Sequence, residues 1–253
     1  MCPSSKTHMN YIKGAYKMEM TLERKTTKTN RFKEGFSFLL YALEAFGVVG
    51  LELLIGNVIE PKIYGVEMSK FTPVQSILHW IFTCTVWGIG AFLIMKDCRK
   101  CKGVDLFDDI KNKKFITKNI KVWQWICIAV GVAVCLVSTW LDWNGSKVVA
   151  EFKSRGPLLF PFQYIYYLFE VSLVLLIIVF GQMAFEKWFN NTKIPFGGIL
   201  VGLTWGLAHW ASKGTLGAGL YAAVGGFVFG SAYVLTNRNL KLSYLLLCIM
   251  FIL

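Results

Sequence analysis

The stretch LLFPFQYIYYLFEVSLVLLIIVFGQMAFE, residues 158–186, decides the fold of this chain. Before its last position it contains one charged residue, Glu170. Its apolar residues form a continuous run, so a helix built from them is apolar on every side, as in a buried or membrane-spanning helix. Because about 20 apolar residues span a bilayer as a helix, the stretch predicts a membrane helix.

Apolar blocks of this kind recur along the whole chain. They cover residues 36–59, 74–95, 122–141, 158–186, 195–212, 215–236 and 240–253. The composition agrees, with 55% hydrophobic and 17% charged residues, and a soluble domain is not built this way. The segments lack the alternating polarity of a membrane β-barrel. The sequence therefore predicts an all-α, polytopic transmembrane bundle of about seven spans, with eight as the alternative.

Lysine and arginine are unevenly divided between the two predicted sides. The polar arm 1–35 carries eight of them, the loop 96–121 nine, and the loops 187–193 and 238–241 two each, against six on the opposite side. The positive-inside rule then places the N-terminus in the cytoplasm and the C-terminus outside. These basic segments next to the membrane account for the net charge of +12. Attraction to anionic lipid headgroups is a sufficient reason for them. The bilayer is thus the expected partner, and nucleic acid is not.

The seven cysteines do not form a disulfide or metal framework. Four of them lie in apolar blocks, where a free cysteine behaves as a small hydrophobic residue. Cys98 and Cys101 form the motif CRKC, which has the spacing of half a zinc site, but no second pair follows. We therefore predict no metal site and no cofactor.

Several polar side chains nevertheless fall inside the apolar blocks. They are Glu44 and Glu52 in the first block, Glu170 in the fourth and His209 in the fifth, with His79 at the outer edge of the second, where we expect it at the membrane interface. Ionisable residues within a membrane are energetically unfavourable and mark candidate functional sites. Nothing in their spacing shows that they meet.

Glycines are concentrated toward the C-terminus. Gly198, Gly202 and Gly206 recur every four residues, and Gly226 and Gly230 repeat the spacing. Small residues four apart share one helix face and allow close helix contact in a membrane, so we predict that these five glycines are packing surfaces. His209 follows on the same segment, where a hydroxyl, a carboxylate or a backbone carbonyl can bind it. Its candidate partners on neighbouring spans are Glu170, Ser231, Tyr233 and Ser243.

The motif WGLAH, Trp205 to His209, together with the glycine-rich run GAGLYAAVGGFVFGSAYVLTNRNL that follows, resembles the CPBP group of integral membrane proteins. This group, also called the Abi family, contains CAAX proteases and bacteriocin-processing proteins. Its motifs are EExxxR followed by glycine, FxxxH, and a final span with histidine and asparagine. The run LLIIVFGQMAFEKWF, residues 175–189, is similar to the first motif in spacing and in Gly181.

The resemblance covers about residues 158–253. The sequence departs from it at the positions of the family's catalytic residues. Leu175 and Leu176 stand where the paired glutamates belong, and Phe180 replaces the arginine. Leu247 or a neighbour takes the place of the final histidine, and Phe251 that of the asparagine. A shifted register would put Glu170 at one glutamate position. Of the family's catalytic set, His209 matches, with Trp205 at the aromatic position. A metal at His209 has no further support in the sequence.

The resemblance implies the fold and a bacterial cytoplasmic membrane, whereas the substitutions favour a pseudoenzyme. We expect a cytosolic basic arm at 1–35, three spans within 36–157 and a CPBP-like four-span core at 158–253. The favoured function is a non-catalytic scaffold, regulator or immunity-type partner of another membrane protein or peptide. The alternatives are an intramembrane endopeptidase in which Glu44, Glu52 or Glu170 serves His209, and a channel or transporter subunit.

Overall fold

The computed structural model describes residues 5–112 and 120–253, with side chains at 29–111 and 120–253. All regular structure in these ranges is helical, which confirms the predicted all-α class. The elements are α1 (Ser5–Leu54), the π-helical turn η1 (Ile55–Ile59), α2 (Glu60–Tyr64), the 3-10 turn η2 (Met68–Lys70), α3 (Pro73–Lys102), α4 (Leu106–Asn112), α5 (Val122–Asp142), α6 (Lys147–Phe189), α7 (Phe196–Val201), the π-helical turn η3 (Gly202–Gly206), α8 (Leu207–Lys213), α9 (Leu216–Leu235) and α10 (Leu240–Ile252). Residues 113–119 of the predicted loop 96–121 lie outside the described ranges.

Five described helical segments are long and apolar enough to cross a membrane, which fits an integral membrane protein. They are Thr29–Tyr64, Pro73–Lys102, Val122–Asp142, Lys147–Phe189 and Leu216–Leu235. The other two predicted blocks differ. The fifth block is divided into α7, η3 and α8, and the seventh forms α10, which has 13 residues. At 1.5 Å per residue such a helix is about 20 Å long, shorter than the hydrocarbon core of about 30 Å.

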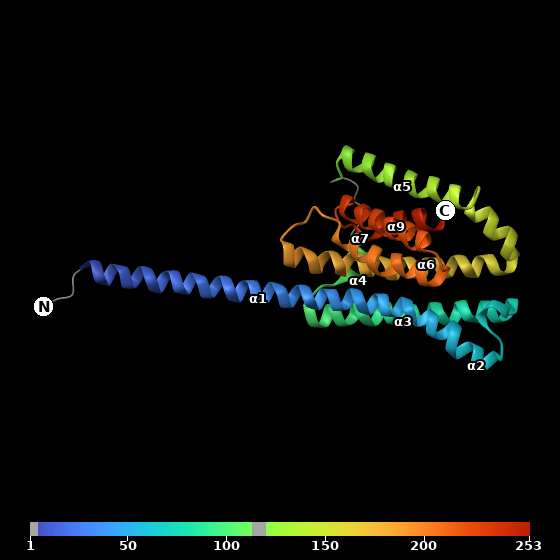
Figure 1. Ribbon diagram of the computed structural model, residues 1–253, viewed down its shortest axis with the longest axis horizontal. Coiled ribbons are helices and arrows are strands. Elements are labelled where there is room, and N and C mark those ends of the chain that lie inside the picture. Colours follow the sequence, from blue (N-terminus) through green and yellow to red (C-terminus); the bar gives the residue numbers. More distant parts are fainter. Residues whose placement is uncertain (1–4, 113–119) are drawn as a thin grey trace.

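Helix α6 is the centre of the bundle. Every residue from Leu173 to Phe180 is buried, because α1, α3, α7 and α10 pack around it. Figure 1 shows α1 and α3 along one side of α6 and the C-terminal helices along the other. One hydrophobic core joins residues of α1 and α3 to those of α6, α9 and α10. The core is therefore continuous across the division that the sequence suggested between residues 157 and 158.

The first turns of α6 fold back over its own body. Gly156 has φ 72° and ψ 173°, a conformation that favours glycine, and Pro157 follows it. Residues 147–155 form a short helical segment before this kink, and the long apolar helix begins after it. The kink brings Glu151 against Gln163 and Tyr167, which lie 12 and 16 residues further along the chain.

The segments richest in lysine and arginine gather at one end of the bundle, called here the basic end. Lys187 pairs with Glu34 at 2.6 Å, the Trp188 indole donates to the Phe32 carbonyl at 3.0 Å, and Arg238 pairs with Glu186. The turns after α2, α5 and α8 lie at the opposite end, called the far end. Which end faces the cytoplasm stays a prediction.

Helix α1 joins the predicted arm and the first predicted span without a break at residue 35. Figure 1 shows its N-terminal part extending well beyond the rest of the molecule. At Gly35 the helix already packs closely on α6, because a Cβ atom there would lie 2.3 Å from the Trp188 indole nitrogen. Residues 1–4 of the arm lie outside the described ranges.

The five predicted packing glycines lie between the α7–η3–α8 segment and α9. A Cβ atom on Gly230 would lie 2.2 Å from the Gly198 Cα atom, and one on Gly206 would lie 2.6 Å from the Ala223 Cα atom. Gly202 and Gly226 face the same contact, where an added Cβ would meet atoms at 2.9 and 2.8 Å. The two backbones thus approach so closely that no side chain fits between them.

Candidate functional site

The polar side chains of the bundle interior collect near its far end. This far-end polar cluster consists of Glu52, Glu60, His79, Lys147, Glu151, Gln163, Tyr166, Tyr167, Glu170, Trp205 and His209. It draws on α1, α2, α3, α6, η3 and α8, and it has three parts, of which the first two meet at Glu52. Buried polar groups are costly unless they are paired, so the pairing within each part shows what the cluster can do.

The first part is a histidine held by a carboxylate. Nδ1 of His79 lies 2.6 Å from Oε2 of Glu60, and its Nε2 lies 3.9 Å from Oε1 of Glu52. His79 is 2% exposed and Glu60 is 4% exposed, so this histidine points into the bundle. Its position at the membrane interface stays a prediction. Nε2 of His79 has no hydrogen-bond partner among the described side chains and backbone.

The π-helical turn η1 positions this pair. It ends at Ile59, directly before Glu60, and contains Gly56. A Cβ atom on Gly56 would lie 3.1 Å from the His79 ring, so the glycine gives the ring its place against α1. Single π-helical turns inside longer helices occur frequently at functional sites. A second one, η3, directly precedes the helix that carries His209.

The second part is organised by Trp205. Its indole donates to Oε1 of Glu170 at 2.9 Å, and its carbonyl accepts from Nδ1 of His209 at 2.9 Å. The Trp205 and His209 rings also pack edge to face, with centroids 4.4 Å apart. The tryptophan therefore stands between the carboxylate and the histidine. His209 finds its partner on its own helix, whereas Ser231 and Ser243 bind other groups.

Glu52 connects the first two parts. Its carboxylate is close enough to Tyr166, Glu170 and His209 to interact electrostatically with each of them. Glu44, the other acidic residue predicted in the first block, is not in the cluster. It is exposed on α1 and interacts with Asp97, which is bound by Tyr41 at the basic end.

The third part of the cluster comes from the start of α6 and the turns that follow it, and its residues were not among the predicted site residues. Oε1 of Glu151 accepts from the Gln163 amide at 3.1 Å and from the Tyr167 hydroxyl at 2.7 Å. Lys147 donates to the Phe251 carbonyl at 2.8 Å and lies over the Tyr167 ring. The Gly156–Pro157 pair could have indicated this contact in the sequence. Such a pair marks a turn in the chain, and a turn there brings Glu151 back against the helix that follows.

The space beside Trp205 is filled by apolar side chains. Val171, Val174, Phe229, Leu247 and Phe251 enclose it, and what is left is too small for a water molecule. Leu247 is fully buried, and the Phe251 ring lies 5.7 Å from that of Trp205. Leu175, Leu176 and Phe180 are buried in the apolar core, with Phe180 against Tyr41.

The histidines, cysteines and acidic residues of the described ranges do not gather as metal ligands do. No group of three histidine, cysteine or acidic side chains there is arranged to hold a metal ion. In the CRKC motif, Cys98 is buried, whereas the exposed Cys101 thiol lies 3.5 Å from Oδ1 of Asp97. The described cysteines are free thiols.

Comparison with protein-family models, with curated proteins and with solved structures finds no match for this chain. The similarity to the CPBP group therefore rests on the quoted motifs alone, and it enters below as part of a proposal.

Proposed function

We propose that this chain is a non-catalytic membrane protein with a degenerate CPBP-type core, acting as a scaffold, regulator or immunity-type partner of another membrane protein or peptide. The observation that carries this proposal is the filled space beside Trp205. Hydrolysis needs a water molecule next to a base, and donors for the developing oxyanion. By the resemblance, Leu247 and Phe251 stand where the family has its last histidine and asparagine. In the structure these two side chains help to enclose the space beside Trp205, which has no room for water.

The hydrogen bonds of Glu170 and His209 also support this proposal. Glu170 is bound by the Trp205 indole, and Nδ1 of His209 is bound to the backbone of its own helix. Each bond fixes its side chain, the Glu170 bond between two helices and the His209 bond along one chain segment. The pairing of Glu170 and Trp205 across two helices is a packing interaction of the kind that membrane bundles use.

Two features support a role in binding. Helix α1 extends far beyond the bundle, and residues 1–35 carry eight basic and three acidic residues (Figure 1). Helix α5 is the least buried of the long apolar helices, and its exposed face includes Trp123, Val130 and Trp140. A basic arm suits anionic lipid or an acidic partner, and an exposed apolar helix suits another membrane helix.

The test is a cleavage assay with purified protein and membrane peptides, in which His209→Gln and His209→Ala are compared with the natural chain. We expect no cleavage by any of the three. His209→Gln keeps a donor and an acceptor and should unfold at the same temperature. His209→Ala should lose about 0.5–1.5 kcal/mol of stability, the net contribution of one intramolecular hydrogen bond. Cleavage that His209→Gln abolishes without a change in thermal stability would overturn the proposal.

An intramembrane endopeptidase with a rearranged site is the second candidate, and the Glu60–His79 pair favours it. A carboxylate on Nδ1 with Nε2 directed away is the arrangement of a histidine that acts as a general base. The same assay therefore includes His79→Gln. Cleavage that depends on His79 and persists in His209→Gln would support this second candidate and exclude the first.

A further inference from the structure

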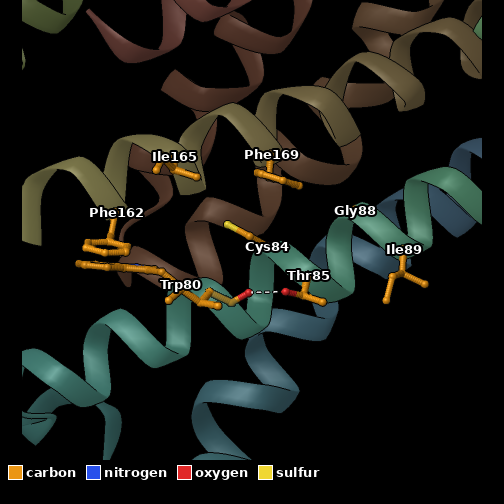
Figure 2. Close-up of a pocket in the computed structure, with 9 residues that line it drawn as sticks. Trp80, Cys84, Thr85, Gly88, Ile89, Phe162, Ile165 and Phe169 are labelled. Carbon is orange, nitrogen blue, oxygen red and sulfur yellow. Dashed lines mark hydrogen bonds between the residues drawn. The ribbon is translucent and has the colours of Figure 1, made fainter.

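An open groove between α3 and α6 lies outside the far-end polar cluster. It has a volume of about 450 Å³. Figure 2 shows its walls, which include Trp80, Cys84 and Gly88 from α3 and Phe162, Ile165 and Phe169 from α6. The hydroxyl of Thr85, which also lines it, donates to the Ile81 carbonyl at 2.8 Å. The groove therefore presents an apolar surface in which the one hydroxyl is already bonded.

Gly88 makes the groove possible. A Cβ atom at this position would lie 3.1 Å from Cε1 of Phe169, so a larger side chain would fill the space in front of that ring. In Figure 2 the Trp80 and Phe162 rings both lie toward one end of the groove. From Trp80 to Ile89 the groove follows α3 for about 13 Å, at 1.5 Å per residue. This length is close to half of the bilayer's hydrocarbon core, which is about 30 Å thick.

A cation stands at the Trp80 end. The Arg155 guanidinium carbon lies 5.9 Å from the centre of the Trp80 ring. Arg155 is exposed, and no acidic side chain of the described residues forms an ion pair with it. Tryptophan is enriched at membrane–water interfaces, and arginine binds phosphate with two parallel hydrogen bonds. The charge and the apolar channel thus complement the two ends of one phospholipid.

We propose that this groove binds an anionic phospholipid, with one acyl chain between α3 and α6 and the headgroup phosphate on Arg155. The acyl chain lies against Cys84, Gly88 and Phe169, and Trp80 lies at the level of the glycerol. The groove is open along its length, so a lipid enters sideways from the bilayer. Binding at this site does not depend on whether the chain is catalytic.

The experiment is a titration of the full chain in detergent with phosphatidylglycerol or phosphatidylcholine, with bound lipid counted by native mass spectrometry. Arg155→Gln should weaken phosphatidylglycerol binding by about fivefold, as expected for one exposed charge contact, and should affect phosphatidylcholine less. Ile165→Trp fills the groove from its exposed edge and should reduce binding of both lipids. The matched control is Lys153→Gln, which removes an exposed cation two residues from Arg155 and should change neither.

Three results would overturn the proposal. One is unchanged phosphatidylglycerol affinity in Arg155→Gln, and another is an equal loss in Lys153→Gln, which would indicate a diffuse charge effect. The third is an Ile165→Trp variant that keeps its lipid but no longer binds a hydrophobic transmembrane peptide. That outcome would assign the groove to a partner helix. Thermal unfolding confirms that each variant is folded, and Ile165→Phe replaces Ile165→Trp if the larger ring prevents folding.

Discussion

At the scale of single residues, the far-end polar cluster shows how a histidine on an apolar helix acquires a defined direction. His79 lies on α3, which is apolar on all sides, so no change of polarity around the helix indicates which side faces inward. The residue that orients it is Glu60, which reaches it from α2 after the π-helical turn η1. The sequence identified His79 as a polar residue of the second apolar block but did not predict its partner, because the pairing depends on how α2 and α3 pack against each other.

The pairing of Glu60 and His79 leads to a prediction about coupling. Glu60→Leu or His79→Leu alone should destabilise the protein by about 1–3 kcal/mol, because each leaves a buried polar group without its partner. The double variant should lose less than the sum of the two, with a coupling of at least about 0.5 kcal/mol. Unfolding in detergent with increasing denaturant measures all three free energies.

The control for this cycle is Glu67→Gln, since Glu67 is an exposed carboxylate between α2 and α3. It should leave the unfolding free energy within about 0.5 kcal/mol of the natural value. Additive losses in the double variant would show that Glu60 and His79 contribute independently, and the described pair would then carry no stability of its own.

At the scale of helices, the contact between the α7–η3–α8 segment and α9 is made of backbone rather than side chains. The four-residue spacing of glycines predicted a packing surface, and the structure places these glycines against one another. The division of the fifth block by η3 was not predicted. A π-helical turn adds a residue to one turn of the helix, and no residue type is diagnostic of this irregularity.

Two glycines of α9 provide a matched comparison. Gly230→Ala should be strongly destabilising, because its Cβ atom would lie 2.2 Å from the Gly198 Cα atom, closer than such atoms approach. At Gly225 nothing lies within 4 Å of an added Cβ atom. Gly225→Ala should therefore be neutral or stabilising by up to about 1 kcal/mol, since alanine favours a helix more than glycine does. Thermal unfolding of the two variants in the same detergent decides the question, and equal effects would contradict the described contact.

At the scale of the whole molecule, composition and charge were sufficient to predict the helical class and which segments share an end. Hydropathy locates the long apolar helices, and lysine and arginine mark the segments that gather at the basic end. They were not sufficient to show that α6 is central or that one core joins both halves. Which apolar helices contact one another depends on how well their side chains fit together. Hydropathy does not describe that fit.

The structure sharpens a prediction about membrane orientation. Cys98 is fully buried, so Cys101 alone of the CRKC pair should react with a membrane-impermeant thiol reagent. It should do so only after the membrane is permeabilised, because the basic end is predicted to be cytoplasmic. A cysteine introduced at the exposed Asp142, at the far end, is the matched control and should react in intact cells. The reverse pattern, read by mass spectrometry of the labelled peptides, would invert the proposed orientation.

A second whole-molecule prediction concerns the extended part of α1. Deleting residues 1–25 should leave a monodisperse and folded protein in detergent, because the described packing of α1 on α6 involves Phe32, Glu34 and Gly35. Gel filtration and thermal unfolding compare the shortened and full chains. Aggregation of the shortened chain would show that the arm is part of the folded core.

The side chain of Gln182 joins α6 to the glycine-rich segment that follows it in the chain. Its amide donates to the Ile194 carbonyl at 2.8 Å and accepts from the Gly197 amide at 3.0 Å, so α6 holds the turn that starts α7. The glycine face of this segment is covered by α9, which follows it in the chain. Residues 196–213 are therefore held by two partners, α6 before them in the chain and α9 after them, and the contact with α6 alone leaves their glycine face uncovered.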